Sequence, residues 1–325
     1  MEFSVVPYTG NSPMKLWPSL ADKAFYLRDA SRPEEAIFYY DSTPVQTSAL
    51  QARAEILSPP VIVLIHGLGD EADSWRHLIP LLSSRFRVLA LDLPGFGRSI
   101  APGKISLKGH AAAVLKLLEG LGIGKEGAGA APPVFLAGNS MGAVVAEAAA
   151  LGKPGLAHGL ILIDGCIPGG PSSPGLFTLA KTLFSRKWYR AYRNDPESLW
   201  ASLYPYYADL DALPQEDRDF LRRRVMERVE SPTQEQAYFS TYRNLVRMYL
   251  CSSSWFSRKI RNFEGKILLL WGEKDKIIPL SSTEAFRNIR SGIELKIIPG
   301  AGHLPHQEKP VETAQIMAEW CYNDI

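Results

Sequence analysis

The sequence predicts a doubly wound, mostly parallel α/β sheet that carries one helical insertion. Apolar runs typical of buried strands alternate with helix-like segments, and polar, Gly-containing turns follow these runs directly. The alternation stops after the sixth predicted strand and resumes only near residue 266. We therefore expect residues 1–165 and 263–325 to form the core, and residues 166–262 to form a helical cap.

The apolar runs have the composition of strands that are covered on both faces. Continuous aliphatic and β-branched runs are typical of such parallel strands. They occupy residues 61–65, 87–91, 134–137, 159–163, 266–271 and 294–298. Two earlier runs, 24–28 and 36–40, predict edge strands of a leading antiparallel portion. Residues 1–20 hold several prolines and predict an irregular arm.

The helix predictions depend on apolar stripes and on residues that begin or end a helix. Asp73 or Ser74 can cap the first helix, Gly122 ends the second, and Pro310 begins the last. The predicted helices cover residues 73–82, 106–121, 143–150, 282–289 and 310–321. The insertion opens with a Pro/Gly/Ser stretch at 168–174 and is then helical and rich in aromatic residues.

The composition excludes several classes of protein. The chain has 325 residues, 46% hydrophobic and 22% charged, which suits one α/β domain with an insertion. A net charge of +2 gives no reason to expect nucleic acid as a partner. The 3 cysteines are far apart and lack metal-ligand spacing, which fits a reducing compartment. No segment reaches the roughly 18 apolar residues of a membrane span. We expect a soluble, cytoplasmic protein of undetermined oligomeric state.

The stretch Leu136–Ala143 carries the strongest chemical signal. An apolar run leads into Gly-Asn-Ser-Met-Gly, and small residues typical of a helix follow. A serine in a sharp turn between strand and helix holds its hydroxyl clear of the backbone. Gly138 and Gly142 flank Ser140 because the neighbouring strand and helix leave no room for a Cβ. The sequence therefore predicts Ser140 as a nucleophile.

A serine hydroxyl needs a base, and the base needs a group that fixes its tautomer. His303 follows the last predicted strand, and Asp275 follows the strand before it, so both belong at the same edge of the sheet as Ser140. Asp164 also ends a strand and is the rival acid. Glu273 is a weaker rival.

Five motifs together resemble the capped, single-domain serine branch of the α/β-hydrolase superfamily. They are HGLG at 66–69, DLPGFGRS at 92–99, GNSMG at 138–142, WGEKDKIIP at 271–279 and GAGHLPHQEKP at 300–310. The resemblance implies that Ser140 is the nucleophile, His303 the general base and Asp275 the group that orients it. It also implies an oxyanion hole made by the backbone N–H groups of Leu68 and Met141. It implies no cofactor and no metal.

Other polar residues near these motifs have structural interpretations. His66 is expected to stabilise the oxyanion turn, and His306 and Glu308 to hold the loop of His303. The remaining expectations are a structural or pocket-lining role for Asp92 and Arg98, a solvated or half-buried position for His110, and a solvated helix face for Arg222, Arg223 and Arg224.

A serine at the elbow predicts acyl chemistry, because relatives that open epoxides or displace halides carry an aspartate there. The sequence thus favours a carboxylesterase-like enzyme acting on a small substrate, which the aromatic cap predicts to be apolar. Asparagine before the serine also resembles hydrolases that cleave a C–C bond in vinylogous diketones. Ala143 and Leu304 depart from the glycine and tryptophan usual in those enzymes. A ligand receptor of the same fold, with slow turnover, is the third alternative.

Overall fold

The computed structural model describes residues 2–10, 12–43, 59–101, 105–124, 131–165, 186–187, 189–251 and 253–323. The predicted Pro/Gly/Ser stretch at 168–174 lies outside these described residues, and so does much of the predicted loop between 122 and 133. No described helix is both long enough and apolar enough to cross a membrane.

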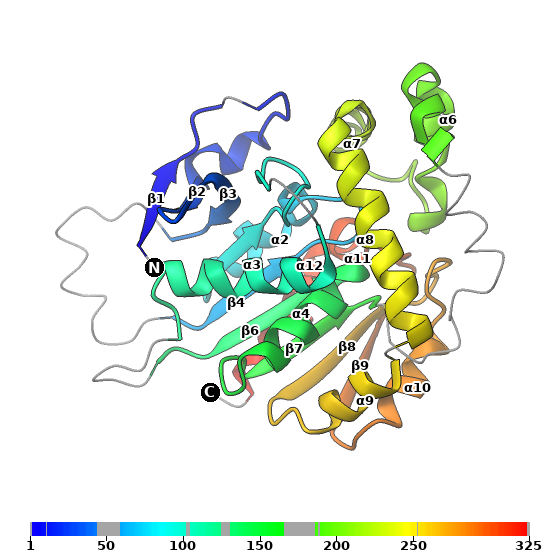
Figure 1. The fold of residues 1–325 in the computed structure, drawn as a ribbon. Coiled ribbons are helices and arrows are strands. Elements are labelled where there is room, and N and C mark those ends of the chain that lie inside the picture. Colours follow the sequence, from blue (N-terminus) through cyan, green and yellow to red (C-terminus); the bar gives the residue numbers. More distant parts are fainter. Residues whose placement is uncertain are drawn as a thin grey trace.

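A nine-stranded sheet organises the protein and confirms the doubly wound prediction (Figure 1). Its strands are β1 Phe3–Pro7, β2 Ala24–Asp29, β3 Arg32–Asp41, β4 Val61–Ile65, β5 Arg87–Leu91, β6 Val134–Asn139, β7 Gly159–Ile163, β8 Lys266–Gly272 and β9 Ile293–Ile298. Their spatial order is β1-β2-β3-β5-β4-β6-β7-β8-β9. All pairs from β5 through β9 are parallel, whereas β1, β2, β3 and β5 pair antiparallel in that order.

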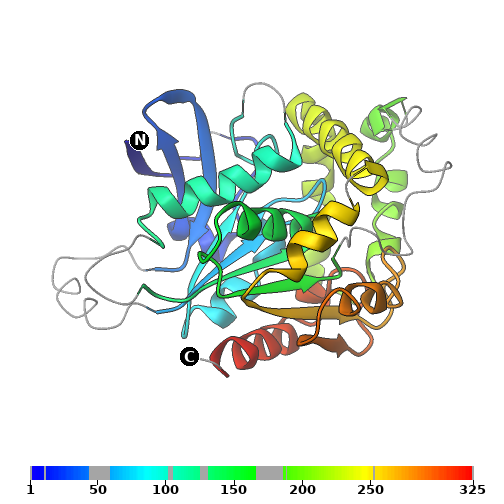
Figure 2. The same cartoon turned by 60° about the horizontal axis from the view of Figure 1, so that its bottom comes forward.

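Alternate side chains of each central strand enter two separate hydrophobic layers. In β4, Val61, Val63 and Ile65 pack with side chains of helices α3, α4 and α9. Ile62 and Leu64 point the other way, into the layer formed with α2 and α12. Figure 2 shows these two groups of helices on opposite faces of the sheet. Because both faces are covered, the strands carry the unbroken apolar runs that predicted them.

The N-terminal arm contains a strand that the sequence analysis placed in irregular structure. Strand β1 pairs with β2 from Phe3 opposite Asp29 to Pro7 opposite Phe25. Most of its side chains are exposed, so no hydrophobic alternation marks it, and its backbone pairing alone makes it a strand. The insertion therefore follows the seventh strand, β7, and not the sixth.

Four helices of the core lie where they were predicted, and α11 Pro305–Glu308 was not predicted. The four are α3 Leu107–Gly120, α4 Met141–Gly152, α10 Ser282–Arg287 and α12 Pro310–Tyr322. The helix expected at 73–82 is instead a 3-10 turn, Ala72–Trp75, followed by α2 Leu78–Leu82. Asp73 does not cap it, because its carboxylate accepts hydrogen bonds from Trp17 N, the Tyr40 hydroxyl and Arg98.

Between β7 and β8 the chain forms four described α-helices. They are α6 Pro196–Ala201, α7 Gln215–Glu230, α8 Pro232–Cys251 and α9 Ser253–Arg261, with 3-10 turns at Tyr192–Asn194 and Tyr204–Tyr206. Helices α7 and α8 lie beside the end of the sheet toward which the parallel strands point (Figure 1). The boundaries of core and cap stay a prediction.

Two polar residues are more buried than expected. Arg224 of α7 is 1% exposed and pairs with Glu71 and Asp73, so only Arg222 and Arg223 of the arginine run face solvent. His110 of α3 is fully buried, and its Nε2 lies 2.9 Å from the Thr241 hydroxyl of α8. Both corrections have one cause: the inserted helices cover faces that would otherwise be solvated.

Candidate active site

Five polar turns meet at the carboxyl edge of the parallel sheet. Each follows a strand directly, so the parallel topology alone brings them to one edge. The turns begin at His66 after β4, Ser140 after β6, Asp164 after β7, Glu273 after β8 and Pro299 after β9.

Ser140 occupies a strained turn between β6 and α4. Its φ of 54° and ψ of −118° place a non-glycine residue at positive φ, a conformation concentrated at functional sites. The flanking glycines are required sterically. A Cβ on Gly138 would lie 2.2 Å from the carbonyl carbon of Gly142, and one on Gly142 would lie 2.1 Å from the oxygen of Ile65. The turn therefore has the strained strand-to-helix geometry that a nucleophile elbow requires, and the nucleophilic role of Ser140 stays a prediction.

The HGLG turn after β4 lies against this elbow. A Cβ built on Gly67 would be 3.4 Å from the Cβ of Ser140, so the backbone that leads to Leu68 passes beside the serine. His66 holds this turn: its Nε2 accepts from Leu93 N at 2.9 Å, which leaves Nδ1–H to donate to Gly67 O at 2.7 Å. Met141 opens α4, where a backbone N–H has no partner within its own helix.

His303 pairs with Asp275 through a hydrogen bond. Its Nδ1–H donates to Asp275 Oδ2 at 2.9 Å, and the two side chains are 2% and 0% exposed. The other carboxylate oxygen of Asp275 accepts from the N–H groups of Ile277 and Ile278 at 2.7 and 3.0 Å. The carboxylate is thus held in place from both sides, and His303 Nε2 keeps its lone pair for a proton.

Asn139 connects the serine turn to the histidine loop. Its side-chain Nδ2 donates to the carbonyl oxygen of His303 at 3.0 Å and to that of Ile163 at 3.2 Å. The residue before Ser140 is therefore bonded to the backbone of the histidine. Sequence analysis noted this asparagine as a family signature and assigned it no structural role, because its partners are remote in the chain.

Residues after His303 hold its loop, as expected for Glu308 and His306. Glu308 accepts from Gly302 N at 2.7 Å through one oxygen and from Ala208 N at 2.8 Å through the other. His306 Nε2 lies 2.9 Å from the hydroxyl of Ser74, and burial lowers the pKa of this imidazole to about 3. His306 is therefore neutral and structural at neutral pH.

The two rival acids have different surroundings. Glu273 is exposed and accepts a hydrogen bond from Gly300 N at 2.9 Å. Asp164 is fully buried at φ 44°, and its Oδ1 accepts from Gly272 N at 2.9 Å. Burial, and then the charge of Asp275, raise the pKa of Asp164 well above 3.8. His303 thus pairs with Asp275, while Asp164 lies next to that pair.

The same three side chains have the donor types of a metal site. Within the described part of the chain, Asp164, Asp275 and His303 form the one group whose possible ligand atoms lie within 4.8 Å of one another. Because both oxygens of Asp275 and Nδ1 of His303 already take part in hydrogen bonds, we interpret the group as an acid–base cluster.

Two tyrosines from the insertion face the site and were not singled out by sequence analysis. The Tyr238 ring of α8 contacts Gly69, whose Cβ would lie 3.1 Å from it. The Tyr206 ring lies 5.8 Å from the His303 ring, and the Tyr206 carbonyl accepts from His303 N at 2.9 Å. Tyr238 also packs with Tyr189 at 5.6 Å and Tyr242 at 6.4 Å between ring centroids. The tyrosines supply an aromatic wall beside the HGLG turn.

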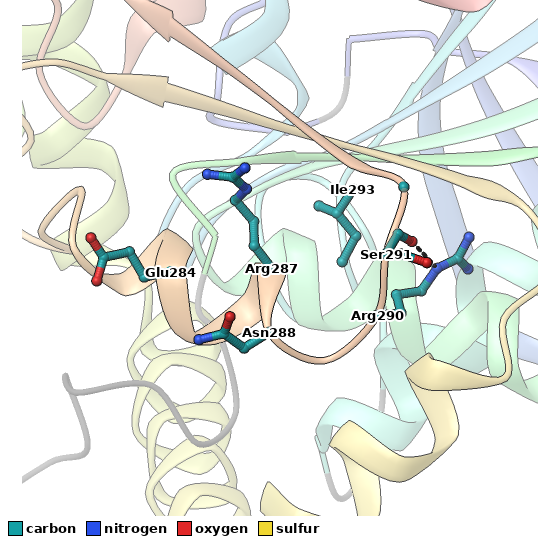
Figure 3. A pocket seen from close by; sticks show the side chains of 7 residues that line it. Glu284, Arg287, Asn288, Arg290, Ser291 and Ile293 are labelled. Carbon is teal, nitrogen blue, oxygen red and sulfur yellow. Dashed lines mark hydrogen bonds between the residues drawn. The ribbon is translucent and has the colours of Figure 1, made fainter.

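A cavity of about 410 Å³ lies elsewhere, between α10 and the start of β9 (Figure 3). Its lining is mostly polar and includes Arg287, Arg290 and Glu284, and the site residues above do not contribute to it. Because β9 begins there and ends near His303, this cavity lies at the opposite edge of the sheet from the acid–base cluster. It has no part in the chemistry developed below.

Residues 62–316 match the model of the Alpha/beta hydrolase family, so the chain belongs to that family. This confirms the superfamily that the five motifs indicated, while the capped serine branch stays a prediction. The match begins within β4 and ends within α12, so it includes every polar turn described above.

Three relatives illustrate the range of the similarity. A pimeloyl-[acyl-carrier protein] methyl ester esterase of Methylococcus capsulatus is 27% identical over 263 residues, which are 80% of this chain and 94% of the esterase. A thermophilic esterase of Thermogutta terrifontis has a TM-score of 0.67 at 23% identity, over 90% of this chain and 95% of its own. A 2-hydroxy-6-oxo-6-phenylhexa-2,4-dienoate hydrolase of Rhodococcus has a TM-score of 0.64 at 19% identity, over 88% and 94%. The two solved structures share the fold.

Proposed function

We propose that this protein is a serine hydrolase that cleaves an ester, or a related acyl bond, of a small apolar substrate through an acyl-enzyme intermediate. The observation that carries the proposal is the 2.9 Å bond between His303 Nδ1 and Asp275 Oδ2 at the sheet edge that also presents the strained Ser140 turn. The 27% identical methyl ester esterase supports ester chemistry.

In this mechanism His303 Nε2 accepts the hydroxyl proton of Ser140 while Oγ attacks the acyl carbon. Asp275 accepts from Nδ1–H and stabilises the imidazolium that forms. The backbone N–H groups of Met141 and Leu68 stabilise the oxyanion, and each contributes about 3 kcal/mol in the transition state. Nε2–H then protonates the leaving alkoxide, and a water deprotonated by the same nitrogen releases the acid.

The insertion, residues 166–262, would act as the cap that selects the substrate. Tyr238 touches the HGLG turn and Tyr206 lies beside the His303 ring, so an acyl group on Ser140 would meet aromatic surfaces from both. Aromatic rings favour apolar groups, and aryl groups gain further from stacking. This wall supports an apolar acyl chain or ring over a charged one.

A burst assay with p-nitrophenyl acetate and butyrate tests the proposal. We expect stoichiometric p-nitrophenol release followed by turnover, and covalent labelling of the protein by a fluorophosphonate probe. Ser140→Ala should lose both the burst and the label, with kcat lowered by about 10⁴-fold or more. Asp275→Asn should lower kcat by about 10³–10⁴-fold because His303 would lose its orienting acceptor.

Ser83→Ala and Glu273→Gln are matched controls, because both residues are exposed. Both variants should keep wild-type turnover. If Asp275→Asn stays fully active, the assigned acid is wrong. If the wild type labels at Ser140 yet hydrolyses no ester, C–C bond cleavage of a vinylogous diketone is the next substrate to assay. Ligand-dependent thermal stabilisation without turnover would favour a receptor.

A further inference from the structure

Asp164 lies next to Asp275 and His303 but has no role in the mechanism proposed above. Its side chain is completely buried and carries two oxygens in different situations. Oδ1 accepts from Gly272 N at 2.9 Å, whereas Oδ2 is buried and has no hydrogen-bond donor among the described residues. A buried carboxylate oxygen without a hydrogen-bond donor is unfavourable, so we expect this oxygen to be protonated.

The carboxylate next to Asp164 is an acceptor. One carboxyl oxygen of Asp275 lies within 4.8 Å of one of Asp164, and both lie within 4.8 Å of a ring nitrogen of His303. Two facing carboxyl oxygens form a hydrogen bond only if one of them is protonated. Asp275 already accepts from Ile277 N, Ile278 N and His303 Nδ1–H, so it is the ionised member of the pair.

We propose that Asp164 is a positioning residue that remains a neutral carboxylic acid and donates a hydrogen bond to the Asp275 carboxylate, which in turn orients His303. The inference rests on the proposed function. A donor on this side would hold the carboxylate against rotation and would reduce its negative charge. Burial, the charge of Asp275 and the more distant charge of Glu308 all raise the pKa of Asp164, which keeps the proton in place at neutral pH.

The backbone at this residue supports a specialised role. Asp164 and Ser140 are the two non-glycine residues at positive φ in the described part of the chain, with φ values of 44° and 54°. Both follow neighbouring strands, β7 and β6. Asparagine tolerates this conformation and also carries an N–H donor, whereas glycine tolerates it and carries no side chain. Replacing Asp164 by asparagine and by glycine therefore separates the effect of losing the hydrogen-bond donor from any effect of the backbone conformation.

The test compares Asp164→Asn with Asp164→Gly under the ester assay above. Asp164→Asn should keep kcat within about threefold of wild type, because its amide can still donate to Asp275 and accept from Gly272. Asp164→Gly should lower kcat by about 10- to 100-fold with little change in KM, the size expected when a hydrogen bond to a charged group is lost. Its acid limb of kcat/KM should move to higher pH, because an Asp275 carboxylate without this donor would stabilise the protonated imidazole more strongly.

An infrared measurement at neutral pH tests the proton without requiring activity. Asp164 and Glu147 should both contribute the C=O stretch of a protonated carboxylic acid to the wild-type spectrum, and Asp164→Asn should lose only the Asp164 band. Glu147→Gln is the matched control: it removes another fully buried carboxyl, on α4, and should leave the pH profile unchanged.

Three outcomes would overturn the proposal. One is that Asp164→Asn loses as much activity as Asp275→Asn, which would make an ionised Asp164 the essential acid. Another is that folded Asp164→Gly keeps the wild-type kcat and pH profile, and the third is that the infrared difference spectrum between the wild type and Asp164→Asn contains no protonated-carboxyl band. A wild type that hydrolyses no ester would instead contradict the proposed function, while the infrared result still reports on Asp164.

Discussion

Strand β4 buries only aliphatic side chains, whereas helix α7 buries arginine–carboxylate pairs beside apolar residues such as Phe220 and Leu221. Every residue from Val61 to Ile65 is 2% exposed or less. In α7, Arg224 contacts Glu71 at 3.2 Å and Asp73 at 3.1 Å, and Arg228 contacts Glu71 at 2.7 Å and also pairs with Asp70. The first region is stabilised by water exclusion alone, and the second by water exclusion together with paired buried charges.

The difference teaches how each region responds to a lost side chain. An aliphatic contact loses a graded amount of free energy as its volume falls. A buried charge whose partner is removed keeps its whole desolvation penalty, so one substitution can cost several kcal/mol. The acidic partners, Asp70, Glu71 and Asp73, closely follow the HGLG turn. The position of α7 and the shape of the proposed oxyanion hole are therefore coupled through these pairs.

The largest effect is expected for Arg224→Ala. It would leave Glu71 and Asp73 buried with one arginine fewer, and we expect the free energy of unfolding to fall by about 3–5 kcal/mol. Burial alone would raise the pKa of Asp73, but Arg98 and Arg224 outweigh it and hold the pKa below 3.8. Urea unfolding monitored by fluorescence at neutral pH measures the loss.

Arg223→Ala is the matched control for this prediction. Arg223 neighbours Arg224 in the same helix but is exposed, so its loss should change the free energy of unfolding by no more than about 0.5 kcal/mol. If the two substitutions lowered the free energy of unfolding equally, the burial of Arg224 and its carboxylate partners would not explain the stability of this interface.

Glu147→Gln should stabilise the protein increasingly as the pH rises. Glu147 of α4 is fully buried, its two oxygens have no partner among the described residues, and burial raises its pKa well above 4.5. The folded state therefore holds the proton more tightly than the unfolded state. The wild type loses stability as the pH rises from 4.5 toward the folded-state pKa.

The free energy of unfolding of Glu147→Gln, relative to wild type, should thus grow by about 1.4 kcal/mol for each pH unit in that window. Urea unfolding at a series of pH values measures this slope. A difference that does not vary with pH would show that Glu147 has the same pKa in both states.

The smallest effect is expected inside the sheet. Ile161 of β7 is fully buried in the layer with α2 and α12, and Ile161→Val removes one methyl group. We expect a loss of about 0.5–1.5 kcal/mol that is the same at pH 5 and pH 8, because no charge is involved. A pH-dependent loss here would remove the contrast between the sheet and the α7 interface.

Sequence patterns were reliable where the cause of the structure is local. The strand Gly159–Ile163 and the helix capped by Ser106 agree with their predicted bounds within a residue, because unbroken apolar runs and caps reflect short-range geometry. Strand β1 was missed because its pairing with β2 leaves no hydrophobic period. Arg224 and His110 were placed near solvent because their covering partners are far away in the chain.

The sequence by itself determined the parallel core and the residues that end its strands, because apolar runs, Gly-containing turns and the alternation of strand and helix along the chain are local features. Only the tertiary structure decided that His303 bonds to Asp275, 28 residues away, and that Asp164 lies beside that pair. It also decided that Arg224 neutralises Asp73 across a separation of 151 residues. Such pairings depend on which folded elements come into contact, and a local sequence pattern does not predict contacts between residues that are far apart in the chain.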